Sequence, residues 1–279
     1  MPEPGKGSRG ARSLLFIVFT ACPVAVAQPC PVPRLLPAYA HNDYYNAHPL
    51  QDALALGYQG VEADYVVVRG RLLVAHSRRE AKETRTLERL YLAPLRARVQ
   101  RCGWVQSPNQ PFLLNIESKE KSVAGYRALR DLLRAYSDII GTIARPKAVR
   151  VVLVGWHPPL AELAGDLDSQ VTVQVWLTRS GLALPHGDSA LVSMVSLDYG
   201  ETMEWRGEGA LSQRDRQMLT QIAGARSALA GRSIRAFNVP AVPAVYQLLL
   251  RSGIDLIGSR NLKFTAQALP RIHPPPRPD

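Results

Sequence analysis

Residues 41–76 read HNDYYNAHPLQDALALGYQGVEADYVVVRGRLLVAH, and the rest of the chain is organised around this stretch. His41 follows one apolar run, and His76 closes another. Glu62 and Asp64 lie between them, on a run rich in Val and Tyr that is typical of a strand. Side chains at positions i and i+2 of a strand point to the same face, so the two carboxylates project together.

Two adjacent carboxylates repel each other and are costly to desolvate unless positive charge lies between them. A hard divalent cation, which takes oxygen ligands, is the natural partner, and pairing of Glu62 and Asp64 with Arg residues is the alternative. The flanking imidazoles of His41 and His76 suit general acid and base catalysis near neutral pH. Taken singly, each histidine is also compatible with an ordinary loop position.

Apolar strand-like runs alternate with helical patterns along the chain, at 35–40, 59–68, 112–116, 149–154, 171–177, 191–197, 233–237 and 254–257. This alternation predicts parallel strands joined by helical crossovers. The eight units favour an α/β fold of the (β/α)8 TIM-barrel type, with a hairpin inserted after the second strand at Arg69-Gly70. A doubly wound open sheet is the second choice, because the Gly-rich phosphate loop that it would need after the first strand is absent.

Polar side chains gather at the carboxyl ends of the predicted strands, which is the end that carries the active site of a TIM barrel. These residues are His41, Glu62, Asp64, Glu117, Asp198 and Asn238.

The N-terminal residues have the pattern of a secretory signal peptide. Three basic residues precede an apolar run, and Ala25-Val26-Ala27 forms a small-residue cleavage site. We therefore expect a signal peptide over 1–27, a barrel domain over 28–270 and a disordered tail over 271–279. The protein is expected to be secreted or periplasmic, with lipidation at Cys22 as a minor alternative.

Cleavage after Ala27 would leave two cysteines, Cys30 and Cys102. An oxidising compartment would permit a disulfide between them, but the sequence does not establish that they are within reach of each other.

The 279-residue chain is 46% hydrophobic and carries a net charge of +11. This composition suffices for one large core. The basic residues, mostly Arg, are scattered rather than clustered on a helix with aromatic residues, so the charge indicates a solvated basic surface and no nucleic-acid partner.

The combination of H-N-D, G-V-E-A-D and L-L-V-A-H, followed by N-I-E-S-K at 115–119, resembles the phosphatidylinositol phospholipase C-like and glycerophosphodiester phosphodiesterase superfamily. Within this superfamily, these motifs are most similar to those of the altered-inheritance-of-mitochondria branch. The resemblance implies a TIM barrel that cleaves phosphodiesters with the help of Ca²⁺ or Mg²⁺.

Carried over residue by residue, the resemblance implies catalytic roles for His41 and His76. It implies metal binding by Glu62, Asp64 and Glu117, and a phosphate-facing role for Lys119.

The chain departs from the glycerophosphodiesterase pattern after the first histidine. Asn42 stands where that branch has an Arg, so Asn42 is expected to donate a hydrogen bond to a phosphoryl oxygen instead. We expect Asp198, Asn238 and Trp205 to contact the substrate at the rim. The change at Asn42 leaves the identity of the substrate headgroup open.

The sequence thus predicts a metal-dependent phosphoric diester hydrolase that acts on a lipid-derived or glycerol-type phosphodiester by two-histidine acid–base catalysis. Its partner would be a small-molecule or lipid substrate, and transient contact with a membrane surface is compatible with this role. The alternative is a non-catalytic barrel that binds a phosphorylated ligand at the same metal site. A glycosidase would also use carboxylates at strand ends, but it does not explain the two histidines.

Overall fold

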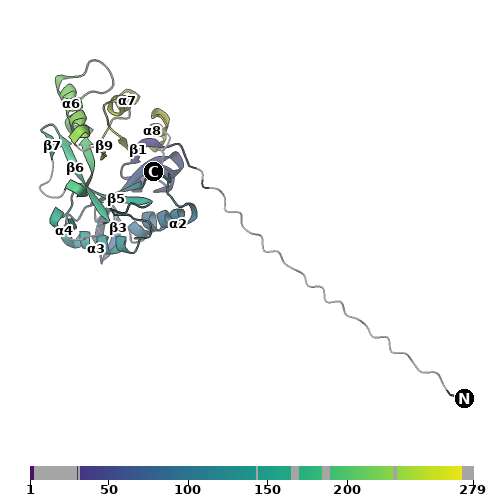
Figure 1. Cartoon of the computed structure of the whole chain (residues 1–279). Helices are drawn as coiled ribbons and strands as arrows, with labels where there is room; N and C mark the ends of the chain where they lie inside the picture. Colours follow the sequence, from purple (N-terminus) through teal and green to yellow (C-terminus); the bar gives the residue numbers. More distant parts are fainter. Residues whose placement is uncertain are drawn as a thin grey trace.

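The computed structural model describes residues 1–2, 30, 32–142, 144–164, 170–183, 189–228 and 231–271. Its parallel strands form a closed barrel, because β1 pairs in parallel with both β2 and β10 (Figure 1). In order around the barrel the strands are β1 (Leu36–Ala40), β10 (Leu256–Ser259), β9 (Ser233–Phe237), β8 (Val192–Asp198), β6 (Val171–Thr178), β5 (Val149–Val154), β4 (Phe112–Ser118) and β2 (Tyr58–Val68). The predicted TIM barrel is confirmed.

Two antiparallel hairpins extend this barrel. The end of the long strand β2 pairs with β3 (Arg71–Val74), in a register that sets Tyr65 opposite Val74. Arg69 and Gly70 make the turn with positive φ angles of 50° and 75°, as a two-residue hairpin loop requires. Strand β7 (Gly181–Ala183) pairs with β6 and was not predicted, because its three residues carry no alternating pattern.

Helices surround the barrel on its outer face (Figure 1). They are α1 (Gln51–Leu56), α2 (Ala93–Cys102), α3 (Val123–Arg134), α4 (Leu160–Ala164), α5 (Tyr199–Thr202), α6 (Gln213–Ala228), α7 (Pro243–Arg251) and α8 (Leu262–Ala268), with short turns η1 (Asp43–Tyr45), η2 (Glu88–Leu92) and η3 (Ser189–Leu191).

Local sequence explains where several of these helices begin and end. Gly57 closes α1 in the left-handed conformation, with φ 86°. Ser122 caps α3 by accepting a hydrogen bond from the Gly125 amide at 3.1 Å. Pro94 lies in the first turn of α2, directly after the π-helical turn η2, so the helical pattern is split at the proline.

The apolar core of the described residues has two main clusters, and a third, small cluster of Val66, Leu73 and Ala75 lies at the β2–β3 hairpin. A large cluster lies between the strands and the outer helices, and a smaller one fills the barrel with Tyr39, Leu113, Val152, Met194 and Leu256. Gly258 makes room for the Tyr39 ring, since a Cβ there would lie 2.5 Å from the Tyr39 hydroxyl oxygen. These apolar side chains fill the interior of the barrel, and the polar side chains of the candidate site lie above them at the carboxyl ends of the strands.

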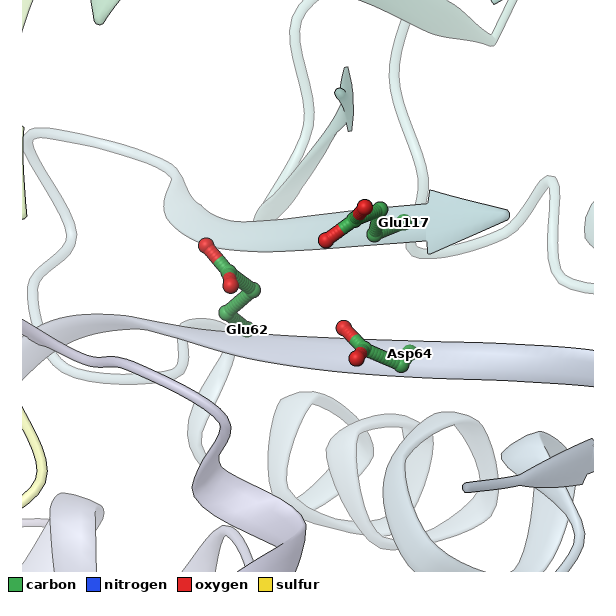
Figure 2. Close-up of side chains that lie close together, drawn as sticks. All are labelled: Glu62, Asp64 and Glu117. Atoms are coloured by element: carbon green, nitrogen blue, oxygen red, sulfur yellow. The ribbon is translucent and has the colours of Figure 1, made fainter. Parts of the chain in front are cut away.

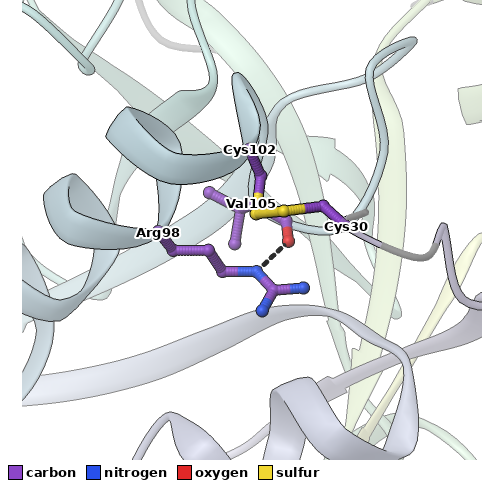
Figure 3. Close-up of a disulfide and its surroundings, with 4 residues drawn as sticks. All are labelled: Cys30, Arg98, Cys102 and Val105. Atoms are coloured by element: carbon purple, nitrogen blue, oxygen red, sulfur yellow. Dashed lines mark hydrogen bonds between the residues drawn. A yellow bond between two sulfur atoms is a disulfide. The ribbon is translucent and has the colours of Figure 1, made fainter. Parts of the chain in front are cut away.

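A disulfide joins Cys30 to Cys102 at the end of α2, and their Cα atoms are 5.6 Å apart (Figure 3). The bond that the sequence left open is therefore formed, and it fastens the segment before β1 to the outer layer. Beside it, Arg98 donates a hydrogen bond to the carbonyl oxygen of Val105.

The predicted cleavage site, Cys22 and the tail from residue 272 onward lie outside the described residues, as does all of the predicted signal peptide except residues 1–2. Within the described ranges, no helix combines the length and the apolar character needed to cross a membrane.

Candidate functional site

Three carboxylates converge at the carboxyl end of two neighbouring strands. Parallel pairing places Asp64 of β2 beside Glu117 of β4, and Glu62 shares the Asp64 face of β2. One oxygen from each side chain lies within 4.8 Å of the others. Figure 2 shows the three side chains turned toward one another from these strands. The sequence placed all three in one cluster, and the geometry agrees.

Asp64 is fully buried, and its two oxygens have different surroundings. Oδ2 accepts a hydrogen bond from the Tyr44 hydroxyl at 2.7 Å and lies 3.0 Å from Lys119 Nζ. Oδ1 is buried, and no residue in the described part of the chain gives it a hydrogen bond. A buried acceptor without a donor costs about 1–3 kcal/mol, and a divalent cation is a ligand that would remove this cost. Glu62, Asp64 and Glu117 therefore fit a hard divalent cation such as Ca²⁺ or Mg²⁺.

Lys119 lies between two of the acids. Its Nζ is 2.9 Å from Glu117 Oε2, as well as being close to Asp64. Burial acts to lower the pKa of Lys119, but the Asp64 and Glu117 carboxylates outweigh it and hold that pKa above its ordinary value. Lys119 is thus a fixed positive charge inside the cluster and not half of a plain surface pair.

Glu117 is the most exposed of the three acids, and burial together with the Asp64 charge raises its pKa. Gly155, which follows β5, packs directly on it. A Cβ at this glycine would lie 2.9 Å from Glu117 Oε1, and its φ of 69° also favours glycine. The absence of a side chain at position 155 leaves the room that the Glu117 side chain occupies.

His41 follows β1 and faces Glu62, with Nε2 3.3 Å from Glu62 Oε1. Its ring is 12% exposed and meets Phe237 edge-on at a centroid distance of 5.5 Å. Burial lowers the pKa of His41, and although Glu62 opposes this effect, Arg235 and Arg260 add to it. A neutral imidazole beside a carboxylate can accept a proton.

His76 follows β3 and faces Asp64, with Nδ1 2.8 Å from Asp64 Oδ2. It is 51% exposed, so it lies at the open side of the cluster. The Tyr44 hydroxyl, 3.4 Å from the same ring nitrogen, helps to hold the imidazole. The two histidines therefore contact two carboxylates that stand two residues apart on one strand.

Arg235 of β9 belongs to the site and was missed in the sequence. Its Nη1 lies 2.6 Å from Glu62 Oε2, while its other nitrogens bond Ser196 Oγ at 2.7 Å and Gln174 Oε1 at 3.0 Å. Burial acts to raise the pKa of Glu62, but Arg235 and His41 hold it below its ordinary value. The available signal was a charged residue within the otherwise apolar strand of β9.

The alternative interpretation, in which an Arg neutralises Glu62, is therefore correct for one oxygen of this carboxylate. The other oxygen, Oε1, faces His41 and remains at the cluster.

Asn42 is buried in the left-handed conformation, with φ 50°. With its amide nitrogen toward the cluster, it donates to Glu62 Oε1 at 3.2 Å and its oxygen accepts from Arg260 Nη2 at 3.1 Å. Asn42 thus joins the carboxylates to a second Arg, which the sequence analysis also missed.

The predicted rim residues form contacts of their own. Asn238 Nδ2 donates to Asp198 Oδ2 at 2.9 Å, and Asp198 also caps α5. The Trp205 indole donates to the Gly209 carbonyl at 3.1 Å. Among the described residues, no hydrogen bond joins these three side chains to the carboxylate cluster, so the structure gives them no direct place in it.

Comparison with known proteins shows what the chain resembles. Residues 32–123 match the AIM6-like phosphodiesterase domain. The predicted resemblance is confirmed. The AIM6-like region contains both histidines, all three carboxylates and Lys119. It covers less than half of the chain, and Arg235 and Arg260 lie beyond it.

A curated relative, the altered inheritance of mitochondria protein 6 of Eremothecium gossypii, is 30% identical over 155 residues. The match covers 47% of this chain and 40% of that protein, so the chain spans less than half the length of its AIM6 relative. Among solved structures, a glycerophosphodiester phosphodiesterase from Agrobacterium tumefaciens strain C58 is similar with a TM-score of 0.48 and 13% identity, over 82% of this chain and 98% of that one.

Proposed function

We propose that this chain is a metal-dependent phosphoric diester hydrolase in which His41 and His76 act as general acid and base. One observation carries the proposal: each imidazole contacts a different carboxylate of a single cluster that fits a cation, at 3.3 Å for His41 and 2.8 Å for His76. The AIM6-like domain over the same residues supports it.

Glu62, Asp64 and Glu117 would hold the cation, which supplies Lewis-acid stabilisation of negative charge on the phosphoryl oxygens when bound. Lys119 adds a fixed positive charge next to it. One imidazole takes the proton from the attacking hydroxyl, and the other gives a proton to the departing alkoxide. The contacts to Glu62 and Asp64 orient the two rings for these transfers.

We propose a lipid-derived or glycerol-type phosphodiester as substrate and a secreted or periplasmic location. The Cys30–Cys102 disulfide supports this location, because such bonds persist in oxidising compartments.

Hydrolysis of bis-p-nitrophenyl phosphate by the purified chain tests the activity. We expect turnover that EDTA abolishes and that added Mg²⁺ or Ca²⁺ restores. His41→Ala is expected to lose about 10²–10⁴-fold in kcat, as removal of a general acid or base does.

Asp64→Asn should lose activity and cation binding together. Asp131→Asn is the matched control, because Asp131 is an exposed residue of α3 with a surface ion pair. Full activity in His41→Ala would refute the catalytic role. Cation binding without any turnover would instead favour the non-catalytic binding barrel.

A further inference from the structure

A groove of about 840 Å³ lies between α1 and the beginning of α8, and its lining includes Arg260, which contacts Asn42 next to the carboxylate cluster. Its polar and charged lining includes Asn46, His48, Asp52, Arg260, Asn261 and Lys263. The proposed acid–base chemistry uses none of these side chains.

Backbone pairing brings the groove next to the catalytic histidine. Ala40 of β1 is in register with Ser259 of β10, and the His41 amide donates to the Ser259 carbonyl at 2.9 Å. Arg260 is the next residue after Ser259, so the closing strand of the barrel delivers its guanidinium to the side of the site where His41 stands.

A short chain of hydrogen bonds connects the cluster to the groove. Asn42 donates to Glu62 Oε1 at 3.2 Å and accepts from Arg260 Nη2 at 3.1 Å. The buried, left-handed Asn42 is a rigid spacer, because its backbone and its amide are both fixed. Arg260 is exposed, but this contact holds its guanidinium between the carboxylate cluster and the groove.

The positively charged side chains near the cluster and the groove differ in whether a carboxylate already pairs with them. Lys119 and Arg235 each contact carboxylates of the cluster. Arg260 and Lys263 form no ion pair with any carboxylate in the described part of the chain. The acidic residue of the groove, Asp52, instead faces His48 at 3.3 Å. Arg260 and Lys263 thus bring two positive charges to the groove, which exceed the negative charge of the Asp52 carboxylate in its lining.

We propose that this groove is a substrate subsite that receives the group esterified to the phosphorus on the His41 side, and that this group carries a second anionic substituent, a phosphate or a carboxylate, bound by Arg260 and Lys263. This inference rests on the proposed phosphodiesterase function. Guanidinium groups bind such planar or tetrahedral anions through paired hydrogen bonds. The preferred substrate is then a phosphodiester with an additional negative charge beyond the scissile bond.

Direct binding tests the subsite without relying on turnover. Calorimetry in the presence of Mg²⁺ would compare the monophosphates of propanediol, butanediol and hexanediol with the corresponding bisphosphates. The linkers vary because the second phosphate must reach the groove while the first occupies the cluster. For at least one linker we expect the bisphosphate to bind about tenfold more tightly than the monophosphate, as a charge-assisted contact provides.

Arg260→Ala should reduce this preference to about twofold or less, and Arg260→Lys should retain part of it. Arg251→Ala is the matched control, because Arg251 is an exposed residue at the end of α7, and it should keep the full preference. Circular dichroism would establish that each variant is folded.

Equal binding of mono- and bisphosphates by the wild type, or an unchanged preference in Arg260→Ala, would overturn the subsite. A preference for the bisphosphate in a chain that fails to hydrolyse bis-p-nitrophenyl phosphate would leave the subsite standing and refute the proposed activity. Hydrolysis without any preference would do the reverse, so the two failures are distinguishable.

Discussion

Arg235 reaches from β9 into the barrel interior and places its Nη1 2.6 Å from Glu62 Oε2 on β2, with both side chains at least 96% buried, since they are 4% and 3% exposed. Through this ion pair, a residue of a distant strand holds Glu62, one of the carboxylates of the candidate cation site, in place. Burial of Glu62 as an anion depends on that support, because an unpaired buried charge is strongly destabilising.

Arg235→Met is therefore expected to lower the free energy of unfolding by about 3–5 kcal/mol, because it leaves Glu62 without its partner. Urea denaturation would measure the change. Arg127→Met is the control, since Arg127 forms an exposed pair with Glu162 and should cost no more than about 1 kcal/mol. A double variant, Arg235→Met with Glu62→Met, should recover most of the loss; equal instability of the single and double variants would contradict the ion-pair explanation.

Lys119→Met is expected to reduce kcat by about 10²–10³-fold, because a fixed cation beside the phosphoryl group is removed. The Mg²⁺ concentration needed for half-maximal activity should not rise, since the lysine ammonium shares Asp64 and Glu117 with the cation. Kinetics at varied Mg²⁺ would separate the two effects. Lys121→Met, at an exposed position two residues later, serves as the control. A raised Mg²⁺ requirement in Lys119→Met would show that the lysine supports the cation instead.

The disulfide closes a loop with a sequence separation of 72 residues, so its loss relaxes the unfolded chain. Replacing both Cys30 and Cys102 by Ala should lower stability by about 2–4 kcal/mol. Thermal or urea unfolding with and without a reductant would measure this. Reduction should destabilise the wild type by a similar amount and leave the double variant unchanged, and a reductant effect on the double variant would be the contrary result.

Asp43 is fully buried and accepts a hydrogen bond from the Tyr91 hydroxyl at 3.0 Å. Burial raises the pKa of Asp43 to about 6 from an ordinary value of 3.8. Between these values the folded state binds more protons than the unfolded state, so the Asp43 contribution to stability falls as pH rises.

Relative to Asp43→Asn, the wild type should therefore lose about 3 kcal/mol of unfolding free energy between about pH 4 and pH 7. Urea denaturation across this range would measure the difference, with Asp131→Asn, a variant of an exposed aspartate, as the comparison. A constant difference between the wild type and Asp43→Asn would show that folding does not raise the pKa of Asp43.

Much of the barrel could be predicted because buried parallel strands leave continuous apolar runs in the sequence. The runs at 149–154 and 233–237 coincide with β5 and β9. The three-residue strand β7 and the π-helical turn η2 could not be found this way, since they depend on hairpin closure and on local backbone irregularity that no hydrophobic period records.

The candidate site likewise contains some residues that the sequence could identify and others that it could not. Glu62 and Asp64 could be paired from their spacing on one strand, and Glu117, His41 and His76 joined them through the motif. Arg235 and Arg260 could not be placed, because they meet Glu62 and Asn42 only when β9 and β10 close the barrel. Contacts between residues at least 173 positions apart produce no local pattern in the sequence.

The two ends of the β2–β3 hairpin differ: strand pairing fixes its base, next to the barrel, whereas its tip, the turn, has room for a change. Pairing between Tyr65 and Val74 fixes the base, from which His76 emerges, whereas the space around Gly70 at the turn is open. Lengthening the turn, or splicing a fluorescent reporter into it, therefore leaves the imidazole where it stands. The tip therefore offers an insertion point for a label close to the open end of the barrel that does not disturb the site.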